Sequence, residues 1–260
     1  MKIVVLVKQV PDTGDERRLD PASGTLDRDA SAAVLDEINE RALEAALSYK
    51  DTRKDTSVTV LSMGPEGVTP ALRTCLAMGA DAAVHVIDEG LAGADLVRTS
   101  KVLAAALRRT DFDLVIAGNE STDGRGGVVP AMVAAHLGVP MLGSLSSVDI
   151  GVSEVSGEQG TEYGSASIRA TLPAMISVTE RFAEGRFPSF KGIMTAKKKP
   201  LSTVSMSELG IDPATAFDGV GRSSIVAIHE RPARVAGTKI VDAGEAGVEL
   251  AEFLASRRLI

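Results

Sequence analysis

The stretch Ile3-Val4-Val5-Leu6-Val7, near the start of the chain, decides the fold. It is a continuous apolar run rich in β-branched residues, and Lys8 is the first polar residue to follow it. A strand with one face in water alternates apolar and polar side chains, whereas a strand covered on both faces does not. The run therefore predicts a central strand of a parallel sheet that has helices on both sides.

The segments that follow alternate between helical and strand periodicity. Ser31 is the predicted cap of the first helix, and Gly79 is the predicted end of the second. Helical spacing of apolar residues covers 34–47, 68–78 and 94–109, and short apolar runs occupy 57–62, 83–87 and 112–117. This alternation predicts right-handed βαβ units and a doubly wound, mostly parallel α/β sheet.

Beyond Pro140 the pattern changes. Residues 144–164 are rich in Ser, Gly and Glu, and 165–172 alternate apolar and polar side chains, which predicts antiparallel strands at the sheet edge. A further short apolar strand covers 174–178. From 201 the apolar pattern is too weak for a second core and ends in a helix around Phe253. We expect an α/β domain over 1–200 and a C-terminal arm over 201–260 that packs on another molecule.

Composition narrows the functional class. Lys and Arg number 28 against 35 Asp and Glu, for a net charge of −7, and the aromatic residues are six Phe and two Tyr. An acidic chain with few aromatic rings is poorly suited to nucleic acid, so we expect no nucleic-acid partner. The single cysteine excludes an internal disulfide, and the three histidines have no metal-ligand spacing. The initial apolar run is too short for a secretory signal, so we expect a soluble, cytoplasmic protein.

The segment 118–127, Gly-Asn-Glu-Ser-Thr-Asp-Gly-Arg-Gly-Gly, is the candidate binding loop. It follows a predicted strand and opens into a predicted helix near Val128, as do ligand loops at the carboxyl ends of parallel strands. Its acceptors suit ribose hydroxyls, and its glycines let backbone N–H groups approach a phosphate. It matches neither the dinucleotide fingerprint nor a Walker loop. A polar connecting loop without a ligand explains its composition equally well.

Residues suited to nucleophilic catalysis are few. Cys75 lies between apolar neighbours on a predicted helix, so we expect a buried, unreactive thiol. His85 and His136 fall inside a predicted strand and a predicted helix and have no triad partners nearby, so both are interpreted as structural.

Three of the six phenylalanines, Phe182, Phe187 and Phe190, fall in the non-periodic stretch 181–191. Apolar rings without a periodic face suggest a contact surface, toward which Arg186, Lys191 and the run 197–199 could attract an acidic partner. The alternative is that the rings hold this loop on the sheet while the lysines are merely solvated.

Four separated blocks together resemble one family. They are 7–13 (Val-Lys-Gln-Val-Pro-Asp-Thr), 76–81 (Leu-Ala-Met-Gly-Ala-Asp), the 118–127 loop, and 190–199 (Phe-Lys-Gly-Ile-Met-Thr-Ala-Lys-Lys-Lys). In this order, and across nearly the whole chain, they resemble the β subunit of electron-transfer flavoprotein. The resemblance implies an adenine-nucleotide-hydrolase-like α/β fold.

The resemblance also implies a function. It implies an electron carrier rather than an enzyme, paired with an α subunit that holds the redox-active FAD. The β subunit would carry AMP, or alternatively a second FAD. Electrons would arrive from acyl-CoA dehydrogenases of fatty acid β-oxidation, or other flavin dehydrogenases, and leave to a membrane quinone oxidoreductase.

Carried over by position, the family's contacts fall on specific residues. The implied partner contacts are Phe187, Phe190 and Lys191, while 8–13 and Ile38 would face the flavin of the α subunit. This chain has Gly127-Val128-Val129 where AMP-binding relatives have Asn-Gln-Thr, which leaves backbone amides, with Arg125 nearby, to meet a phosphate. The implied cofactor contacts are Leu6, Asp36, Asn39, Met63, Gly118, Asn119, Glu120, Ser121, Thr122, Asp123, Gly124, Arg125, Gly126, Gly127, Val128 and Val129.

Two other functions compete with this interpretation. An autonomous adenine-nucleotide-binding module of the universal-stress-protein type accounts for the 118–127 loop but not for the phenylalanines or the lysine run. A nicotinamide-dependent oxidoreductase is disfavoured because no glycine fingerprint follows the first strand.

Overall fold

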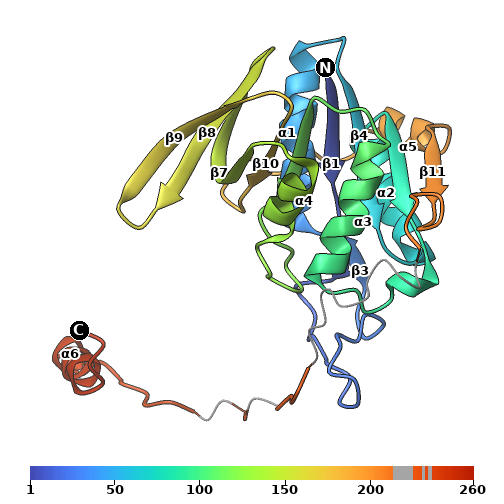
Figure 1. Cartoon of the computed structure of the whole chain (residues 1–260). Coiled ribbons are helices and arrows are strands. Elements are labelled where there is room, and N and C mark those ends of the chain that lie inside the picture. The colour runs from blue at the N-terminus through green and yellow to red at the C-terminus, as the bar shows by residue number, and fades with distance from the viewer. Residues whose placement is uncertain (213–224, 230–231, 234–235) are drawn as a thin grey trace. The chain divides into compact units, whose positions relative to one another are not determined.

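The computed structural model of the 260-residue chain describes residues 1–212, 225–229, 232–233 and 236–260. The chain forms two compact units, Met1–Ile225 and Val226–Ile260. The first unit is an α/β fold, and Figure 1 labels its elements. The strands are β1 Lys2–Leu6, β2 Gln9–Pro11, β3 Ala33–Leu35, β4 Ser57–Met63, β5 Ala82–Val86, β6 Leu114–Gly118, β7 Met141–Ile150, β8 Glu154–Thr161, β9 Gly164–Thr171, β10 Ala174–Val178 and β11 Leu201–Val204. The helices are α1 Glu37–Thr52, α2 Thr69–Met78, α3 Leu96–Arg108, α4 Val129–Leu137, α5 Phe190–Ala196 and, in the second unit, α6 Ala246–Ser256, with short 3₁₀ turns at Glu66–Val68 and Glu89–Leu91.

The main sheet has nine strands in the order β11-β5-β4-β1-β6-β10-β7-β8-β9. The seven strands from β11 to β7 pair in parallel, and β8 and β9 add two antiparallel pairings at one edge. β1 lies between β4 and β6, and its residues Ile3, Val4 and Val5 are almost wholly buried. The predicted central strand, the doubly wound sheet and its antiparallel edge are therefore confirmed.

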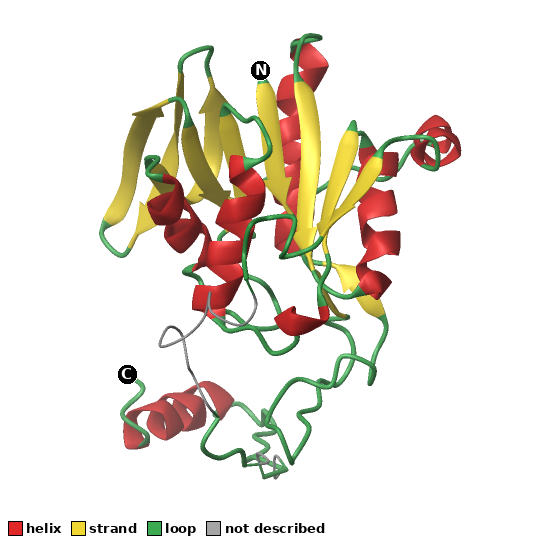
Figure 2. Ribbon diagram, turned by 45° about the vertical axis from the view of Figure 1, so that its right-hand side comes forward, coloured by secondary structure: helices red, strands yellow, loops and turns green. Residues whose placement is uncertain are grey.

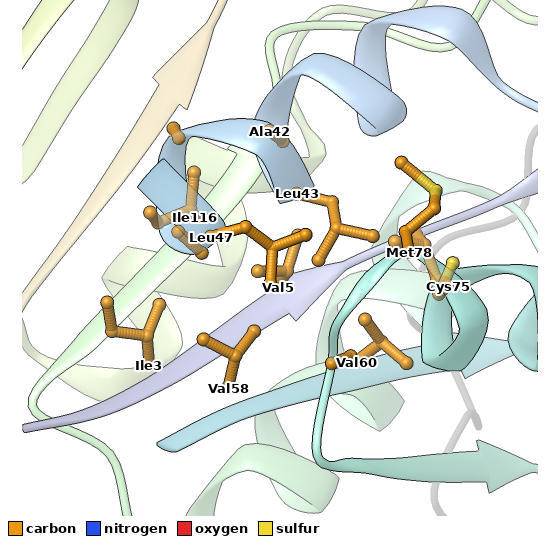
Figure 3. Packing of buried hydrophobic residues seen from close by; sticks show 14 of the residues in the cluster. Ile3, Val5, Ala42, Leu43, Leu47, Val58, Val60, Cys75, Met78 and Ile116 are labelled. Atoms are coloured by element: carbon orange, nitrogen blue, oxygen red, sulfur yellow. The ribbon is translucent and has the colours of Figure 1, made fainter. Parts of the chain in front are cut away.

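Helices cover both faces of the parallel strands (Figure 2). On one face, Leu43 of α1 packs with the alternate β1 residues Ile3 and Val5 (Figure 3), and Leu72 of α2 belongs to the same cluster. On the other face, residues of α3 and α4 pack with Val4 and Leu6. Two apolar cores on opposite faces explain why β1 shows no polar alternation in the sequence. Across the described residues, none of the helices has the length and apolarity needed to cross a membrane.

Most predicted bounds in the parallel part lie within two residues of the observed ones, and Gly79 does end α2. The first helix differs. The chain at 33–35 is an extended strand, paired antiparallel with Gln9–Pro11, so the helix starts later than predicted. The cap is Asp36, whose side chain accepts hydrogen bonds from the N–H groups of Ile38 and Asn39. The predicted Ser31 cap is wrong because strand pairing overrides the local helical periodicity.

The chain just beyond residue 200 belongs to the first compact unit. Residues Leu201–Val204 form β11, which pairs in parallel with β5, so the sheet extends past the expected start of the arm. Beyond it, Met206 is fully buried in the core between the sheet and α3. The C-terminal helix exists as predicted, at Ala246–Ser256. A four-residue edge strand with two exposed positions has too little apolar pattern to be detected in the sequence.

The burial of Met206 makes a testable contribution to stability. Met206→Ala should lower the free energy of unfolding by about 2–5 kcal/mol, because it removes buried methylenes and leaves a cavity. The same substitution at Met194, whose side chain is exposed, is the matched control and should change it by less than about 0.5 kcal/mol. Urea denaturation followed by circular dichroism measures both, and equal losses would contradict the placement of Met206 in the core.

Candidate functional site

The sheet changes winding direction between β1 and β6. After β1 the chain builds β4 and β5 on one side, and it then crosses to β6 on the other side of β1. The connections leaving the carboxyl ends of β1 and β6 therefore diverge, which creates the crevice where open α/β sheets bind ligands. The segments that leave these ends are Val7–Pro11 and the cradle loop, as residues 118–127 are called from here on.

Asp36 joins this loop to α1. Its Oδ1 accepts hydrogen bonds from the N–H groups of Ile38 at 3.0 Å and Asn39 at 3.3 Å, which caps the helix. Its Oδ2 accepts from the backbone N–H of Thr122 at 2.7 Å and from the Thr122 hydroxyl at 2.9 Å. The residue has no exposed surface, so four hydrogen bonds satisfy a buried carboxylate. The middle of the cradle loop is thus held against the start of α1.

Asp123 holds the same loop to the segment that follows β1. Its carboxylate accepts from Lys8 Nζ at 2.7 Å and from Arg28 Nη2 at 3.0 Å, and its side chain is 1% exposed. Burial alone would raise the pKa of this carboxyl. The hydrogen bonds and positive charge of Lys8, aided by Ser121 and Arg28, outweigh burial and hold the pKa well below its ordinary value. Asp123 is therefore a charged structural link, and its oxygens are already engaged.

A glycine at the start of the loop allows close packing on α1. A Cβ added at Gly118 would lie 2.6 Å from Nδ2 of Asn39 and 3.0 Å from the Ile38 side chain, so the strand end packs directly on the first turn of α1. Further along, Arg125 and Gly127 adopt positive φ angles of 46° and 65°, which turn the chain sharply before α4. Leu6, Asn39 and Thr122 are buried at this end of the sheet.

The residues present suit an adenine nucleotide. Asn119 Oδ1 is buried and accepts no hydrogen bond from any described residue, so it is available to a ribose hydroxyl or an adenine amino group. No side chain caps the N-terminus of α4, so the N–H of its first residue, Val129, can meet a phosphate, although Pro130 at the next position has no N–H to donate. The cations Lys8, Arg28 and Arg125 are all 40% exposed or more and lie on or against the loop.

The structure brings most predicted cofactor contacts to one end of the sheet. Leu6 and Met63 pack in or against the same core cluster, while Asp36, Asn39 and the cradle loop are joined by the contacts above. Their role in holding a ligand stays a prediction. Sequence reasoning missed Arg17, which donates to the carbonyl oxygen of Thr122, and Arg28. Both lie in the polar stretch 12–29, where the only signal was the presence of basic residues.

Cys75 and His85 lie in the core, whereas His136 is only partly buried. Cys75 is fully buried, and burial, with a smaller contribution from the charge of Glu40, raises the pKa of its thiol to about 12. His85 is also buried, with Nε2 3.0 Å from the carbonyl oxygen of Gly64. A thiol that stays protonated at neutral pH is a poor nucleophile.

A second candidate site is the docking segment, defined as residues 182–196. Phe187 and Phe190 are 94% and 83% exposed, whereas Phe182 is partly buried against the core. The suggestion that the rings hold the loop on the sheet therefore applies to Phe182 alone. The stretch is also less irregular than expected, because α5 begins at Phe190 with Ser189 as its cap. Ile193 and Met194 add exposed apolar surface on α5.

The lysine run beyond α5 divides into two parts. Lys197 and Lys198 are exposed, as is Lys191. Lys199 instead turns inward and donates from Nζ to the carbonyl oxygens of Leu76 at 2.8 Å and Ala80 at 2.6 Å, at the C-terminus of α2. Burial lowers the pKa of Lys199. The run therefore leaves two charges exposed at the surface, and its third lysine fastens the chain after α5 to α2.

Comparison with known proteins identifies relatives along the whole chain. The family described as "Electron transfer flavoprotein domain" matches residues 23–209. The protein named "Electron transfer flavoprotein subunit beta" of Mycobacterium tuberculosis is 48% identical over 263 residues, covering 99% of each chain. The protein of the same name from Megasphaera elsdenii is 31% identical over 271 residues, covering all of both chains. The "Caffeyl-CoA reductase-Etf complex subunit CarD" of Acetobacterium woodii is 33% identical over 241 residues, or 92% of each.

The ion pairs of Asp123 should make stability depend on acid pH. Because the folded pKa lies below the unfolded value of about 3.8, their contribution is complete above that pH and is lost as the pH falls toward the folded pKa. Asp123→Asn should lower the free energy of unfolding at neutral pH by about 1–3 kcal/mol, less than for a wholly buried pair because both cations are partly exposed. It should also make the decline of stability below about pH 4 shallower.

Urea denaturation at several pH values measures both effects. Asp111→Asn is the matched control, since Asp111 pairs with Lys2 on the surface and should contribute little. A decline with acid as steep in Asp123→Asn as in the unchanged protein would contradict the role given to the Asp123 carboxylate.

Proposed function

Because the chain belongs to the electron transfer flavoprotein family as a β subunit, we propose that it forms one half of an electron carrier and binds an adenine nucleotide in the cradle loop. The observation that carries the proposal is the loop itself, which Asp36 and Asp123 hold at the point where the sheet changes winding direction and which contains an unsatisfied buried acceptor, Asn119 Oδ1. This membership favours the electron carrier over a stress-protein-like nucleotide module or a nicotinamide enzyme.

In this proposal the redox-active FAD is held mainly by an α subunit, with residues 8–13 and Ile38 facing it. When bound, the flavin supplies the chemistry of accepting and releasing electrons. The chain's own residues bind the nucleotide and enclose it. Asn119 accepts from the nucleoside, Arg28, Lys8 and Arg125 balance phosphate charge, and the amides of 127–129 donate to phosphate oxygens. The bound nucleotide is AMP, or alternatively a second FAD.

The docking segment supplies the contact with electron donors. Two exposed rings flanked by Lys191, Lys197 and Lys198 suit a partner with an apolar pocket rimmed by acidic side chains. We assign this partner to the acyl-CoA dehydrogenases of fatty acid β-oxidation or to other flavin dehydrogenases. The name of the Acetobacterium woodii relative, a subunit of a Caffeyl-CoA reductase–Etf complex, supports a donor that acts on CoA thioesters. Electrons then pass to a membrane quinone oxidoreductase, and the subunit itself transforms no substrate.

The second unit has its own proposed contact. Val248, Leu250 and Phe253 of α6 are exposed, and no described residue of that helix is buried. An 11-residue helix with this much exposed apolar surface needs a covering surface. We assign that role to the α subunit, on which the C-terminal arm would pack.

Nucleotide content tests the cradle loop. Replacing Asp123 by Ala together with Gly126→Val should leave the purified complex with less than about a tenth of its β-bound nucleotide, because one change frees the loop and the other places a branched side chain on it. Gly143→Val, at a position on β7 with open space around it, is the control and should retain the nucleotide. Chromatography of the denatured complex measures it, and full occupancy in the first variant would refute the location.

Electron acceptance tests the docking segment. Phe190→Ala should raise the KM of a flavin dehydrogenase for the complex by about tenfold or more, because exposed aromatic anchors dominate such contacts. The absorption spectrum of the bound flavin should not change. Tyr163→Ala, at an equally exposed ring in the β8–β9 turn, is the control and should leave the KM unaltered. If both variants behave like the unchanged complex, Phe190 is no anchor.

A further inference from the structure

Arg186, immediately before the exposed Phe187, is tied to α1 by two carboxylates, of which Glu44 makes most of the contacts. Glu44 accepts hydrogen bonds from the Arg186 backbone N–H at 3.0 Å, from Nε at 2.8 Å and from Nη2 at 2.7 Å. Nη2 also lies 2.9 Å from Asp51 Oδ2, and the Ser48 hydroxyl donates to Glu44 at 2.7 Å. Glu44 is thus fixed on its own helix and holds both the backbone and the side chain of Arg186. A two-point guanidinium contact of this kind specifies orientation as well as position.

The residues before Arg186 are held to the same helix. A Cβ added at Gly185 would lie 2.9 Å from Glu40 Cβ and 3.3 Å from the Glu40 backbone carbonyl, so the chain passes close against α1 here. Arg41 donates to the carbonyl oxygen of Phe182, at the start of the segment. Successive turns of α1 therefore provide fixed points for residues 182–186.

The far end of the docking segment is held to a different helix. Gly192 packs so tightly on the carbonyl oxygen of Ala77 in α2 that no Cβ could be accommodated. Arg73, also on α2, donates from Nη1 to the carbonyl oxygens of Ala196 and Lys199, both at 2.9 Å. Phe187 and Phe190 therefore lie between a fastening on α1 and a fastening on α2.

Phe187 and Phe190 are exposed, so packing in a core does not hold these rings in place. The chain on both sides of them is nevertheless fastened by charged and close-packed contacts. An exposed loop without such contacts would lose entropy on binding, and fixing it beforehand reduces that loss. We propose that Glu44, acting through Arg186, is a positioning residue that presents Phe187 and Phe190 in their docking geometry. This inference rests on the docking role proposed above.

A purely structural role for Glu44 makes a different prediction. If the Glu44–Arg186 ion pair only stabilised the domain, removing it would change the KM for the complex by the same factor with and without the two rings. If it acts by positioning the rings, its removal should have no further effect once they are gone. A double-mutant cycle separates the two cases.

The experiment uses the purified αβ complex and a flavin-containing acyl-CoA dehydrogenase from the same source. Glu44→Gln should raise the KM for the complex by about tenfold with kcat unchanged, because a charged contact that fixes the segment is lost while electron transfer within the docked pair is unaltered. Arg186→Lys should do the same, since an ammonium cannot reproduce the guanidinium fork. Asp111→Asn is the control, because Asp111 lies outside the docking segment and its side chain, 85% exposed, pairs with Lys2 on the surface.

Two readouts decide the outcome. Amide hydrogen exchange of residues 182–196 should be faster in Glu44→Gln by about tenfold, and unchanged in Asp111→Asn. In a complex that already carries Phe187→Ala and Phe190→Ala, adding Glu44→Gln should leave the KM where the double variant has it. Unchanged exchange, or a further rise in KM of the same size without the rings, would overturn the inference.

Failure of the proposed function has a different signature. If Phe187→Ala with Phe190→Ala leaves the KM unaltered, the docking role itself is wrong, and a KM effect of Glu44→Gln would then have no rings to act through. If that double variant raises the KM while Glu44→Gln changes neither KM nor exchange, docking stands and positioning by Glu44 is wrong.

Discussion

The buried carboxylate of Asp36 is the contact on which the functional end of the sheet depends. One of its oxygens caps α1 and the other holds Thr122, so the start of the helix and the middle of the cradle loop are fixed by a single side chain. Leaving either set of N–H groups buried without this acceptor would cost the full desolvation of those groups. The Asp36 carboxylate therefore fixes both the direction in which α1 leaves the sheet and the path of the cradle loop.

The same helix, α1, also connects the cradle loop with the docking segment, the second candidate site. The helix begins at the cradle loop, and its later turns carry Arg41 and Glu44, which fasten the docking segment. A rigid helix thus relates the proposed nucleotide site to the proposed partner surface. Sites built on regular elements are held more closely than sites on free loops, which suits a carrier whose cofactor must approach that of its partner.

The sequence predicts the scaffold well because local physics determines it. The run 3–7, the helical spacings and Gly79 each carry their own signal, and the parallel sheet follows from their alternation. The contacts that complete the site are long-range. Asp36 meets a residue 86 positions away and Arg28 meets one 95 positions away, and no periodicity records such pairs. The contact of Lys199 with α2 could not be predicted for a related reason. A run of lysines is typical of a solvated surface, whether or not one of them turns inward. Composition alone could not distinguish a binding loop at 118–127 from a plain connecting loop. The predicted cofactor residues came instead from the resemblance to a family.

The stoichiometry of nucleotides in the unchanged αβ complex tests the central claim most directly. Denaturing the purified complex and quantifying what it releases counts FAD and AMP per αβ pair. We predict one adenine nucleotide in addition to the FAD of the α subunit, either AMP or a second FAD. A single FAD with no further nucleotide would contradict the assignment of the cradle loop as a binding site.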